Sequence, residues 1–311
     1  MHSDTIAVVP QTSAKKLKKR HTSTNLAGYL FISPWLIGFC FLTLWPMILS
    51  LYYSFTDYSL LNSAQWTGFD NMKEIFHDRF FYNSLKVTFT FVLFSVPIKL
   101  AVALGVAMLL SRNIRGMSVY RTLLYLPSLI GGSVAVAVLW KNIFGLDGFI
   151  NNIVPWFGIA PKNWIGMPQT ALSTIIILSV WQFGSAMIIF IAGLKQIPTE
   201  LYEASSADGA GKIRRFFHIT LPMLSPVIFF NLVMGVIGSF QTFTSAFVIT
   251  NGGPMNSTQV YAVYLYQVAF GNLHMGYASA LAWILLLIVA IATSINFLAS
   301  KYWVYDGEGS R

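Results

Sequence analysis

Residues 231–245 place polar and small side chains at helical spacing inside a long apolar run. Amide and hydroxyl groups donate and accept hydrogen bonds, which is what a hydroxyl-rich solute needs. Small and hydroxyl residues also let membrane helices pack closely. We predict that Asn231, Gln241, Thr242 and Ser245 line a solute path. We favour that role for Gln241, leave packing open as the alternative for Thr242 and Ser245, and expect Gly235 and Gly238 to pack helices. A continuous helix would align one stripe, which consists of Asn231, Gly235, Gly238, Thr242 and Ser245 with Gln241 on its flank.

A second polar face is expected near residue 182. Trp181, Gln182 and Ser185 share one side of a helix within the apolar run 171–194. Polar residues inside such runs tend to face the interior of a helix bundle or a cavity. We therefore predict that these three residues line the same solute path, and we favour that role most for Gln182.

The chain lacks the groupings that catalysis or metal binding requires. Its single Cys40 lies in an apolar run, and no Ser or Asp stands in a nucleophile–base arrangement. The G-x-x-x-x-G-K-[ST] phosphate loop is absent, so ATP hydrolysis by that route needs another subunit. We predict no catalytic residue, no metal and no bound cofactor. The histidines have no ligand spacing and are scattered as His2, His21, His77, His218 and His274.

Lys99 is a charged residue near the centre of the run 86–110, two residues after Pro97. Placing a charged side chain at that depth in a membrane costs free energy, so we expect Lys99 to have a structural or functional role. One interpretation is a proton or ion pathway. The other is a structural cation paired with an acid or with carbonyl groups freed by the proline. No Asp or Glu lies inside any expected span to complete a relay, so we favour the structural role.

Composition identifies the elements that must position these residues. Of the 311 residues, 55% are hydrophobic and 10% are charged, against about a quarter charged in soluble domains. This excludes disorder, a fibrous repeat and an ordinary cytosolic enzyme, and predicts an all-α polytopic membrane protein. A membrane-spanning helix needs about 20 apolar residues. Six runs qualify, at about 30–54, 86–110, 120–141, 171–194, 222–248 and 279–300.

Basic residues predict the orientation, because Lys and Arg collect on the cytoplasmic side of a membrane. The net charge of +9 would suggest nucleic-acid binding in a soluble protein, but we expect none here. Both termini are predicted to be cytoplasmic. We divide the chain into a basic, disordered tail at 1–25, a membrane domain at 26–300 and a tail at 301–311. The basic residues on the predicted cytoplasmic side are Lys15, Lys16, Lys18, Lys19, Arg20, Arg112, Arg115, Arg121, Lys195, Lys212, Arg214, Arg215, Lys301 and Arg311.

The opposite loops carry weaker signals. A short interfacial helix is expected after Gly148, and Asn251-Gly252-Gly253-Pro254 predicts a turn. The tyrosines that follow fit an aromatic belt at the lipid headgroups, with a binding role as the alternative. These tyrosines are Tyr261, Tyr264 and Tyr266.

The loop of about 195–221 has the most informative pattern. Pro198 starts a short helix, Asp208-Gly209 ends it, and a second short helix follows at about 212–217. Small residues between Ala204 and Ala210 would leave the helix backbone accessible to another protein. Glu203 at its edge could pair with a basic residue of that protein.

These residues resemble the EAA loop of ABC importer permeases, whose pattern is about E-A-A-x-x-x-G-x(9)-I-x-L-P. Here Glu203, Gly209 and Ile219 keep the spacing of the pattern. The chain departs from it at two positions, since Ser205 stands in place of the usual third-position Ala and Ala207 in place of the usual apolar residue before Asp. Over about residues 26–300 the chain resembles the carbohydrate branch of this family, which is the maltose and glycerol-phosphate type. The segments that carry this likeness are Ser33-Pro34-Trp35, Tyr120-Arg121-Thr122-Leu123 with Leu126-Pro127, Trp181-Gln182-Phe183-Gly184, Asn251-Gly252-Gly253-Pro254 and Gly276-Tyr277-Ala278-Ser279-Ala280.

The resemblance implies the type I importer permease fold and a bacterial cell-membrane location. It implies a second permease subunit, two copies of an ATPase that bind ATP and Mg, an extracytoplasmic solute-binding protein and a sugar substrate. The residues that would dock the ATPase are Glu203, Ala204, Ser205, Asp208, Gly209 and Ala210. An ion- or proton-coupled secondary transporter is the alternative, but it predicts intramembrane acids and an internal repeat, which the sequence lacks. An intramembrane enzyme is opposed by the missing catalytic groups.

Overall fold

The computed structural model describes residues 21–111 and 114–305, in which all regular secondary structure is helical. The chain divides into two units, Met1–Ser50 and Leu51–Arg311. Most of the predicted tail at 1–25 and residues 306–311 of the C-terminal tail lie outside the described residues. The described start of that tail is ordered by contact, because Tyr305 N donates to Ser225 Oγ at 2.8 Å and Trp303 packs on Phe229.

The first apolar run forms consecutive helical segments without a break. It comprises α1 (His21–Phe39), a π-helical turn (Cys40–Leu44) and α2 (Trp45–Tyr53). Residues Gly28–Tyr53 are long enough and apolar enough to cross a membrane, and no part of the most apolar stretch is buried within the protein. Its length and composition are therefore those of a membrane-spanning helix.

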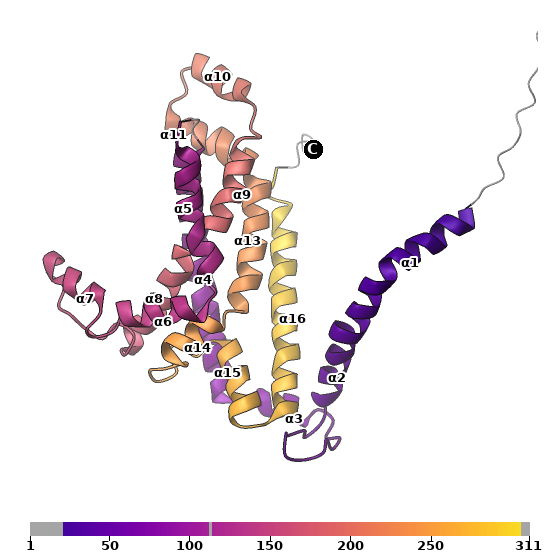
Figure 1. The fold of residues 1–311 in the computed structure, drawn as a ribbon. Coiled ribbons are helices and arrows are strands. Elements are labelled where there is room, and N and C mark those ends of the chain that lie inside the picture. Colours follow the sequence, from indigo (N-terminus) through magenta and orange to yellow (C-terminus); the bar gives the residue numbers. More distant parts are fainter. Residues whose placement is uncertain (1–20, 112–113, 306–311) are drawn as a thin grey trace, which may run out of the picture. The chain divides into compact units, whose positions relative to one another are not determined.

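The second unit is built around α4 (Arg79–Leu110), a helix of 32 residues. Its neighbours are α8 (Pro168–Trp181), α9 (Gly184–Leu194) and α13 (Ser225–Phe240), and α16 (Met275–Ser300) packs on α13. These helices run alongside one another in the bundle (Figure 1). The buried face of α4 carries apolar residues along its length, including Phe91, Val96, Ala103 and Ala107. The periodicity of α4 thus places it at the centre of the packing.

Three of the predicted spans are broken helices. The first break lies between α5 (Met117–Ile130) and α6 (Val134–Ile143), which are bent by 100°. The α8–α9 pair is bent by 42°, and the helical segment Lys212–Met223 meets α13 at 65°. Within the described residues, three helices could cross a membrane alone, or up to six if each bent pair counts once. Six predicted runs therefore correspond to six membrane-length segments, but the expectation of continuous helices is wrong for three of them.

Two of the three breaks have a local cause in the sequence. Gly131 and Gly132 separate α5 from α6, and Ser133 restarts the chain by accepting a hydrogen bond from Val136 N. The segment before α13 contains Pro222 and Pro226, and proline cannot supply the backbone donor that continues a helix. Hydropathy sums composition over a window, so it finds these segments and misses their breaks.

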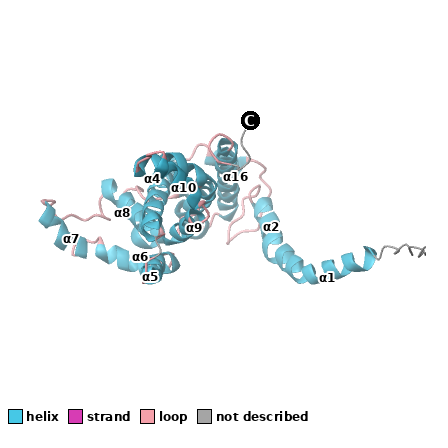
Figure 2. Cartoon of the chain, turned by 90° about the horizontal axis from the view of Figure 1, so that it is seen from above, coloured by secondary structure: helices cyan, strands magenta, loops and turns pink. Residues whose placement is uncertain are grey.

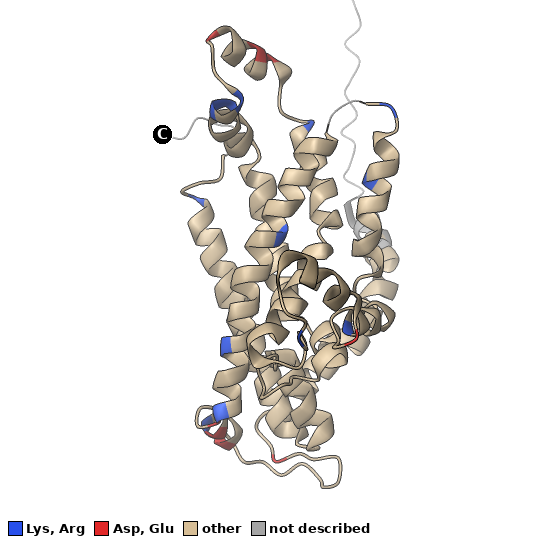
Figure 3. Cartoon of the chain, turned by 90° about the vertical axis from the view of Figure 1, so that its left-hand side faces the viewer, with Lys and Arg blue, Asp and Glu red and all other residues tan. Residues whose placement is uncertain are grey.

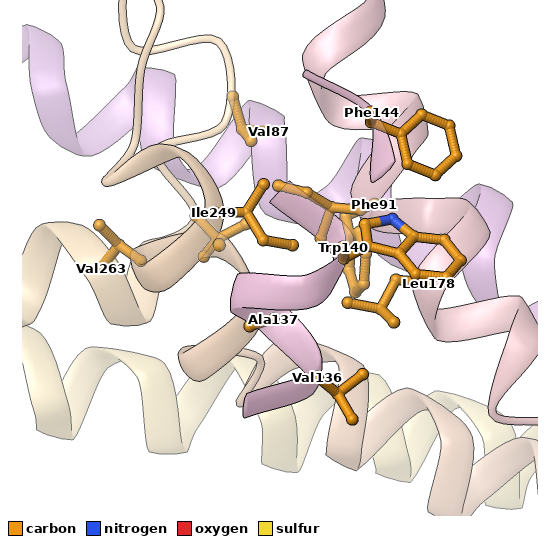
Figure 4. Close-up of a cluster of buried hydrophobic side chains, with 12 residues drawn as sticks. Val87, Phe91, Val136, Ala137, Trp140, Phe144, Leu178, Ile249 and Val263 are labelled. Carbon is orange, nitrogen blue, oxygen red and sulfur yellow. The ribbon is translucent and has the colours of Figure 1, made fainter. Parts of the chain in front are cut away.

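A buried cluster joins α4, α6 and α8 to α14 (Thr244–Thr250) and α15 (Tyr261–Tyr266). Figure 4 shows Phe91, Trp140 and Leu178 close together. The Trp140 indole Nε1 donates to the Thr174 carbonyl oxygen at 3.0 Å, so the polar atom of this buried ring is satisfied. The cluster therefore joins four other helices to α4.

Two short elements lie at the same end of the bundle as α15. One is α3 (Asp70–Ile75), and the other is α7 (Phe149–Ile153), which continues as a 3-10 turn (Val154–Phe157) and projects to one side (Figure 2). The predicted helix after Gly148 is confirmed by α7. The Asn151 side chain accepts from the Trp164 indole at 2.7 Å and donates to the Leu146 and Lys162 carbonyl groups, which closes this loop.

The predicted aromatic belt is wrong for Tyr261 and Tyr264. Tyr261 is fully buried, and its hydroxyl donates to the Leu281 carbonyl oxygen at 2.8 Å. Tyr264 is 7% exposed. Its hydroxyl and that of Tyr277 both donate to the Asp78 carboxylate. Burial, together with the bond to Asp78, raises the pKa of the Tyr264 hydroxyl, so it remains a donor. These tyrosines join α15 and α16 to the start of α4.

The remaining helical segments form the opposite end of the bundle. They are α10 (Thr199–Ala207), α11 (Lys212–Arg215), a π-helical turn (Phe216–Thr220) and α12 (Leu221–Met223). A π-helical turn (Gln267–Gly271) also follows α15 at the other end. Figure 1 shows α10 and α11 beyond the ends of α5 and α9.

Candidate functional site

A cavity of about 440 Å³ lies among α4, α8, α9 and α13. It is bounded by the two points where helices are interrupted, at Gln182 after α8 and at Thr242 after α13. Interrupted helices within a membrane leave polar backbone groups beside a cavity, which is where transport proteins place solute sites. The cavity is therefore the first candidate for a solute path.

Four predicted path residues line this cavity, namely Gln182, Ser185, Asn231 and Thr242. They come from different elements, because Ser185 is on α9 and Asn231 on α13. The Asn231 amide nitrogen donates to the Val227 carbonyl oxygen at 3.0 Å, one turn earlier in the same helix. The fold brings together the two polar faces that the sequence predicted separately.

Three other predicted residues lie outside the cavity lining. The Trp181 ring packs against Trp140, with 5.7 Å between ring centroids. Four of the five residues of the predicted stripe line the cavity, namely Asn231, Gly235, Gly238 and Thr242. Ser245 and the flanking Gln241 do not line it, because α13 ends at Phe240 and a new helix begins at Thr244.

The two glycines of α13 differ in their surroundings. A Cβ atom added to Gly235 would meet Val96 Cγ1 at 3.1 Å, so Gly235 packs against α4 as expected. A Cβ atom at Gly238 would meet nothing within 4 Å, and Gly238 faces the cavity. The packing role expected for Gly238 is therefore wrong.

A hydrogen-bond network holds the broken helices together beside the cavity. Gln182 Nε2 donates to the Gly131 carbonyl oxygen at 2.9 Å, which links the α8–α9 break to the α5–α6 break. Ser128 Oγ donates to the Gln182 carbonyl oxygen and accepts from Ser185 N, both at 3.1 Å. Gly184 lets α5 and α9 touch, because a Cβ atom there would lie 2.7 Å from the Leu124 carbonyl oxygen. Gln182 is thus a structural junction as well as a cavity residue.

Lys99 also lines the cavity, which sequence reasoning missed. Lys99 lies one turn after Val96, the residue that packs against Gly235 of α13. Lys99 and Val96 are therefore on the same side of α4, and both line the cavity. The expected structural partner is not found among residues 21–111 and 114–305, where no ion pair or hydrogen bond joins the Lys99 ammonium to another group. No local signal in the sequence identifies Lys99 as a cavity residue, because the other cavity walls come from α8, α9 and α13.

The second candidate site is the α10–α11 loop. Its turn is a Schellman motif, in which Ala210 N donates to the Ser205 carbonyl oxygen at 2.9 Å and Gly209 N donates to that of Ser206 at 3.1 Å. Gly209 has φ +73°, which glycine adopts without strain. The predicted helix–turn–helix is confirmed in geometry.

Side-chain contacts tie α10 to the segment that follows it. Arg215 Nη1 donates to Ser206 Oγ at 2.6 Å, and the Tyr202 hydroxyl and Thr220 Oγ1 are 2.9 Å apart. The loop is therefore preformed. Its outward residues include the predicted docking residues, of which Glu203, Ala204, Asp208 and Gly209 are exposed and Ser205 and Ala210 are half-buried.

Comparison with known proteins identifies the family. The family model described as "Binding-protein-dependent transport system inner membrane component" matches residues 76–301. The probable ABC transporter permease protein YesP of Bacillus subtilis is 53% identical over 296 residues, covering 94% of this chain and 96% of YesP. The probable starch degradation products transport system permease protein AmyD of Thermoanaerobacterium thermosulfurigenes is 34% identical over 290 residues, covering 91% and 97%.

A solved structure shares the fold. The crystal structure of a bacterial ABC transporter involved in alginate import aligns with a TM-score of 0.76 at 22% identity, covering 90% of this chain and 96% of the other. The predicted type I importer permease fold is thereby confirmed. The chain belongs to the family of binding-protein-dependent transport system inner membrane components.

Proposed function

We propose that this chain is the permease subunit of an ATP-driven sugar importer in the bacterial cell membrane. The relative AmyD is named for transport of starch degradation products. The cavity supports a sugar because amides and hydroxyls at Gln182, Ser185, Asn231 and Thr242 match the donors and acceptors of sugar hydroxyls. Phe230 adds an aromatic face that could cover the apolar side of a sugar ring.

The observation that carries the proposal is the position of the α10–α11 loop in the chain. It connects α9 directly to the segment that leads into α13, and both helices line the cavity. A protein bound to α10 would therefore be able to move α9 and α13, two walls of the cavity, together. The Schellman turn and the Arg215–Ser206 hydrogen bond join α10 to α11, so a movement of α10 would be passed to the segment that follows.

The partners that we propose follow from the absence of a phosphate loop in the sequence and from the exposed residues of α10 and of the cavity. We propose that two copies of a separate ATPase bind ATP and Mg and dock on α10. We propose that a second permease completes the path, since the cavity residues Phe230 and Met234 are 51% and 56% exposed. An extracytoplasmic solute-binding protein would deliver the sugar at the α15 end. In the cycle, closure of the ATPases turns the cavity outward, and hydrolysis returns it inward.

Charge supports an orientation with α10 in the cytoplasm. Charged residues of the Leu51–Arg311 unit lie mostly toward the two ends of its helices (Figure 3). Acids lie at both ends, among them Glu203 near α10 and Asp78 near α15. Basic residues are more numerous at the α10 end, where the described ones are Arg115, Arg121, Lys195, Lys212, Arg214, Arg215 and Lys301, than at the α15 end, where they are Lys73, Arg79, Lys86, Lys141 and Lys162. By the positive-inside rule, the α10 end and both termini face the cytoplasm.

Reconstituted transport tests this function. The two permeases, the ATPase and the binding protein of the same transport system are placed in proteoliposomes with ATP inside and labelled sugars outside. We expect uptake that requires ATP and the ATPase, because the chain has no phosphate loop of its own. Uptake that persists without the ATPase and collapses with an ion gradient would contradict the proposal.

A further inference from the structure

The cavity that would carry the sugar contains one cation. Lys99 comes from α4 and is half-buried, and the other polar lining residues, among them Gln182, Ser185, Asn231 and Thr242, are neutral. No acidic residue is among the described residues that line the cavity. The positive charge of the cavity is therefore not neutralised by its own wall.

An uncompensated charge at this depth is costly, and the described part of the chain offers Lys99 no carboxylate. The salt bridge found among residues 21–111 and 114–305 joins Lys73 to Asp70, which lie on α3. A cation inside a low-dielectric cavity attracts an anion strongly. An anion that passes through the cavity could lower this cost while it is bound.

We propose that Lys99 binds the carboxylate of an acidic sugar during import, a proposal that rests on the sugar-import function above. The ammonium would hold the carboxylate in a charge-assisted hydrogen bond while neutral amides and hydroxyls hold the ring hydroxyls. A singly charged carboxylate matches a single lysine. A phosphate carries nearly twice that charge at neutral pH and is held best by several donors, such as those of arginine.

The position of Lys99 fits contact with the solute rather than with the membrane. Val96 lies one turn before Lys99 on α4, and Leu100 follows Lys99 directly. Both line the same cavity, so this face of α4 forms a cavity wall. Lys86, on the same helix, is exposed and does not line the cavity. It lies about 20 Å along the helix axis from Lys99 at 1.5 Å per residue. Lys86 therefore supplies a matched control.

The test compares a disaccharide that contains one glucuronate residue with its methyl ester, which has the same shape and no charge. Uptake is measured in the complete reconstituted complex, after the binding protein has been shown to bind both compounds. Wild type is expected to take up the acid at least about tenfold faster than the ester. Lys99→Met should lower uptake of the acid at least about tenfold, the scale of one hydrogen bond to a charged group, and leave uptake of the ester unchanged. Lys99→Arg should restore part of the loss, and Lys86→Gln should behave as wild type.

The outcomes separate this inference from the function on which it rests. If wild type takes up neutral sugars with ATP but not the acid, or if Lys99→Met lowers uptake of the acid and the ester equally, the carboxylate role is wrong and sugar import stands. A preference for glycerol phosphate over the glucuronate disaccharide would also overturn it. If ATP drives uptake of no sugar, the proposed function fails and the role of Lys99 fails with it.

Discussion

Glu203→Lys should lower ATP-driven uptake by about a hundredfold or more while the membrane helices remain folded. Glu203 is exposed on α10, so its replacement disturbs no internal packing. Reversing a charge that pairs across an interface costs several kcal/mol, because the partner's cation then faces another cation. Uptake and retention of the ATPase in a pull-down measure the effect, and thermal unfolding of the purified chain measures folding.

Glu200→Lys is the control for this prediction. It makes the same change of charge on the same short helix, three residues earlier, at another exposed position. We expect it to lower uptake much less than Glu203→Lys. Equal losses in the two variants would show that the net charge of α10 matters and that Glu203 has no specific contact. Full retention of the ATPase by Glu203→Lys would contradict the docking role.

Gly184→Ala should destabilise the chain and impair transport. The added Cβ atom would lie 2.7 Å from the Leu124 carbonyl oxygen and 2.7 Å from Tyr125 Cα, and neither backbone atom can rotate away. Helices α5 and α9 must then separate, which also strains the Ser185–Ser128 hydrogen bond beside the cavity. Overpacking of this kind costs about 1–3 kcal/mol, and a lowered thermal unfolding midpoint measures it.

Gly238→Ala is the matched control for stability. It adds the same methyl group to a helix of the same bundle, at a position where nothing lies within 4 Å. Its unfolding midpoint should equal that of wild type or exceed it slightly, because alanine favours the helix. If both variants unfold at the wild-type temperature, the close α5–α9 contact is wrong.

Much of the fold follows from the sequence because apolar composition over about 20 residues is a local property. The six membrane-length segments, the short helix α7 and the Asp208-Gly209 turn are all local in this sense. The burial of Tyr261 is not local. Its backbone nitrogen donates to Thr88 Oγ1, 173 residues away, so its place depends on how α15 packs against α4.

The candidate sites differ in the same way. The α10–α11 loop could be predicted because its spacing and its glycine define it within one short segment. The cavity could be predicted only in part. Gln182 reaches Gly131, 51 residues earlier. The end of α13 at Phe240 removes Ser245 from the expected stripe and Gln241 from its flank. Lys99 could not be assigned to the cavity because its neighbours come from three other helices.

Chemical labelling of residue 204 tests the central claim, which is that α10 docks a separate ATPase in the cytoplasm. Ala204 is exposed, and Cys40 is the only cysteine, so Ala204→Cys in a Cys40→Ser background carries one thiol. We expect a membrane-impermeant maleimide to label it only from the cytoplasmic side, with labelling suppressed when the ATPase is bound. Labelling from outside the cell, or equal labelling with and without the ATPase, would contradict the account.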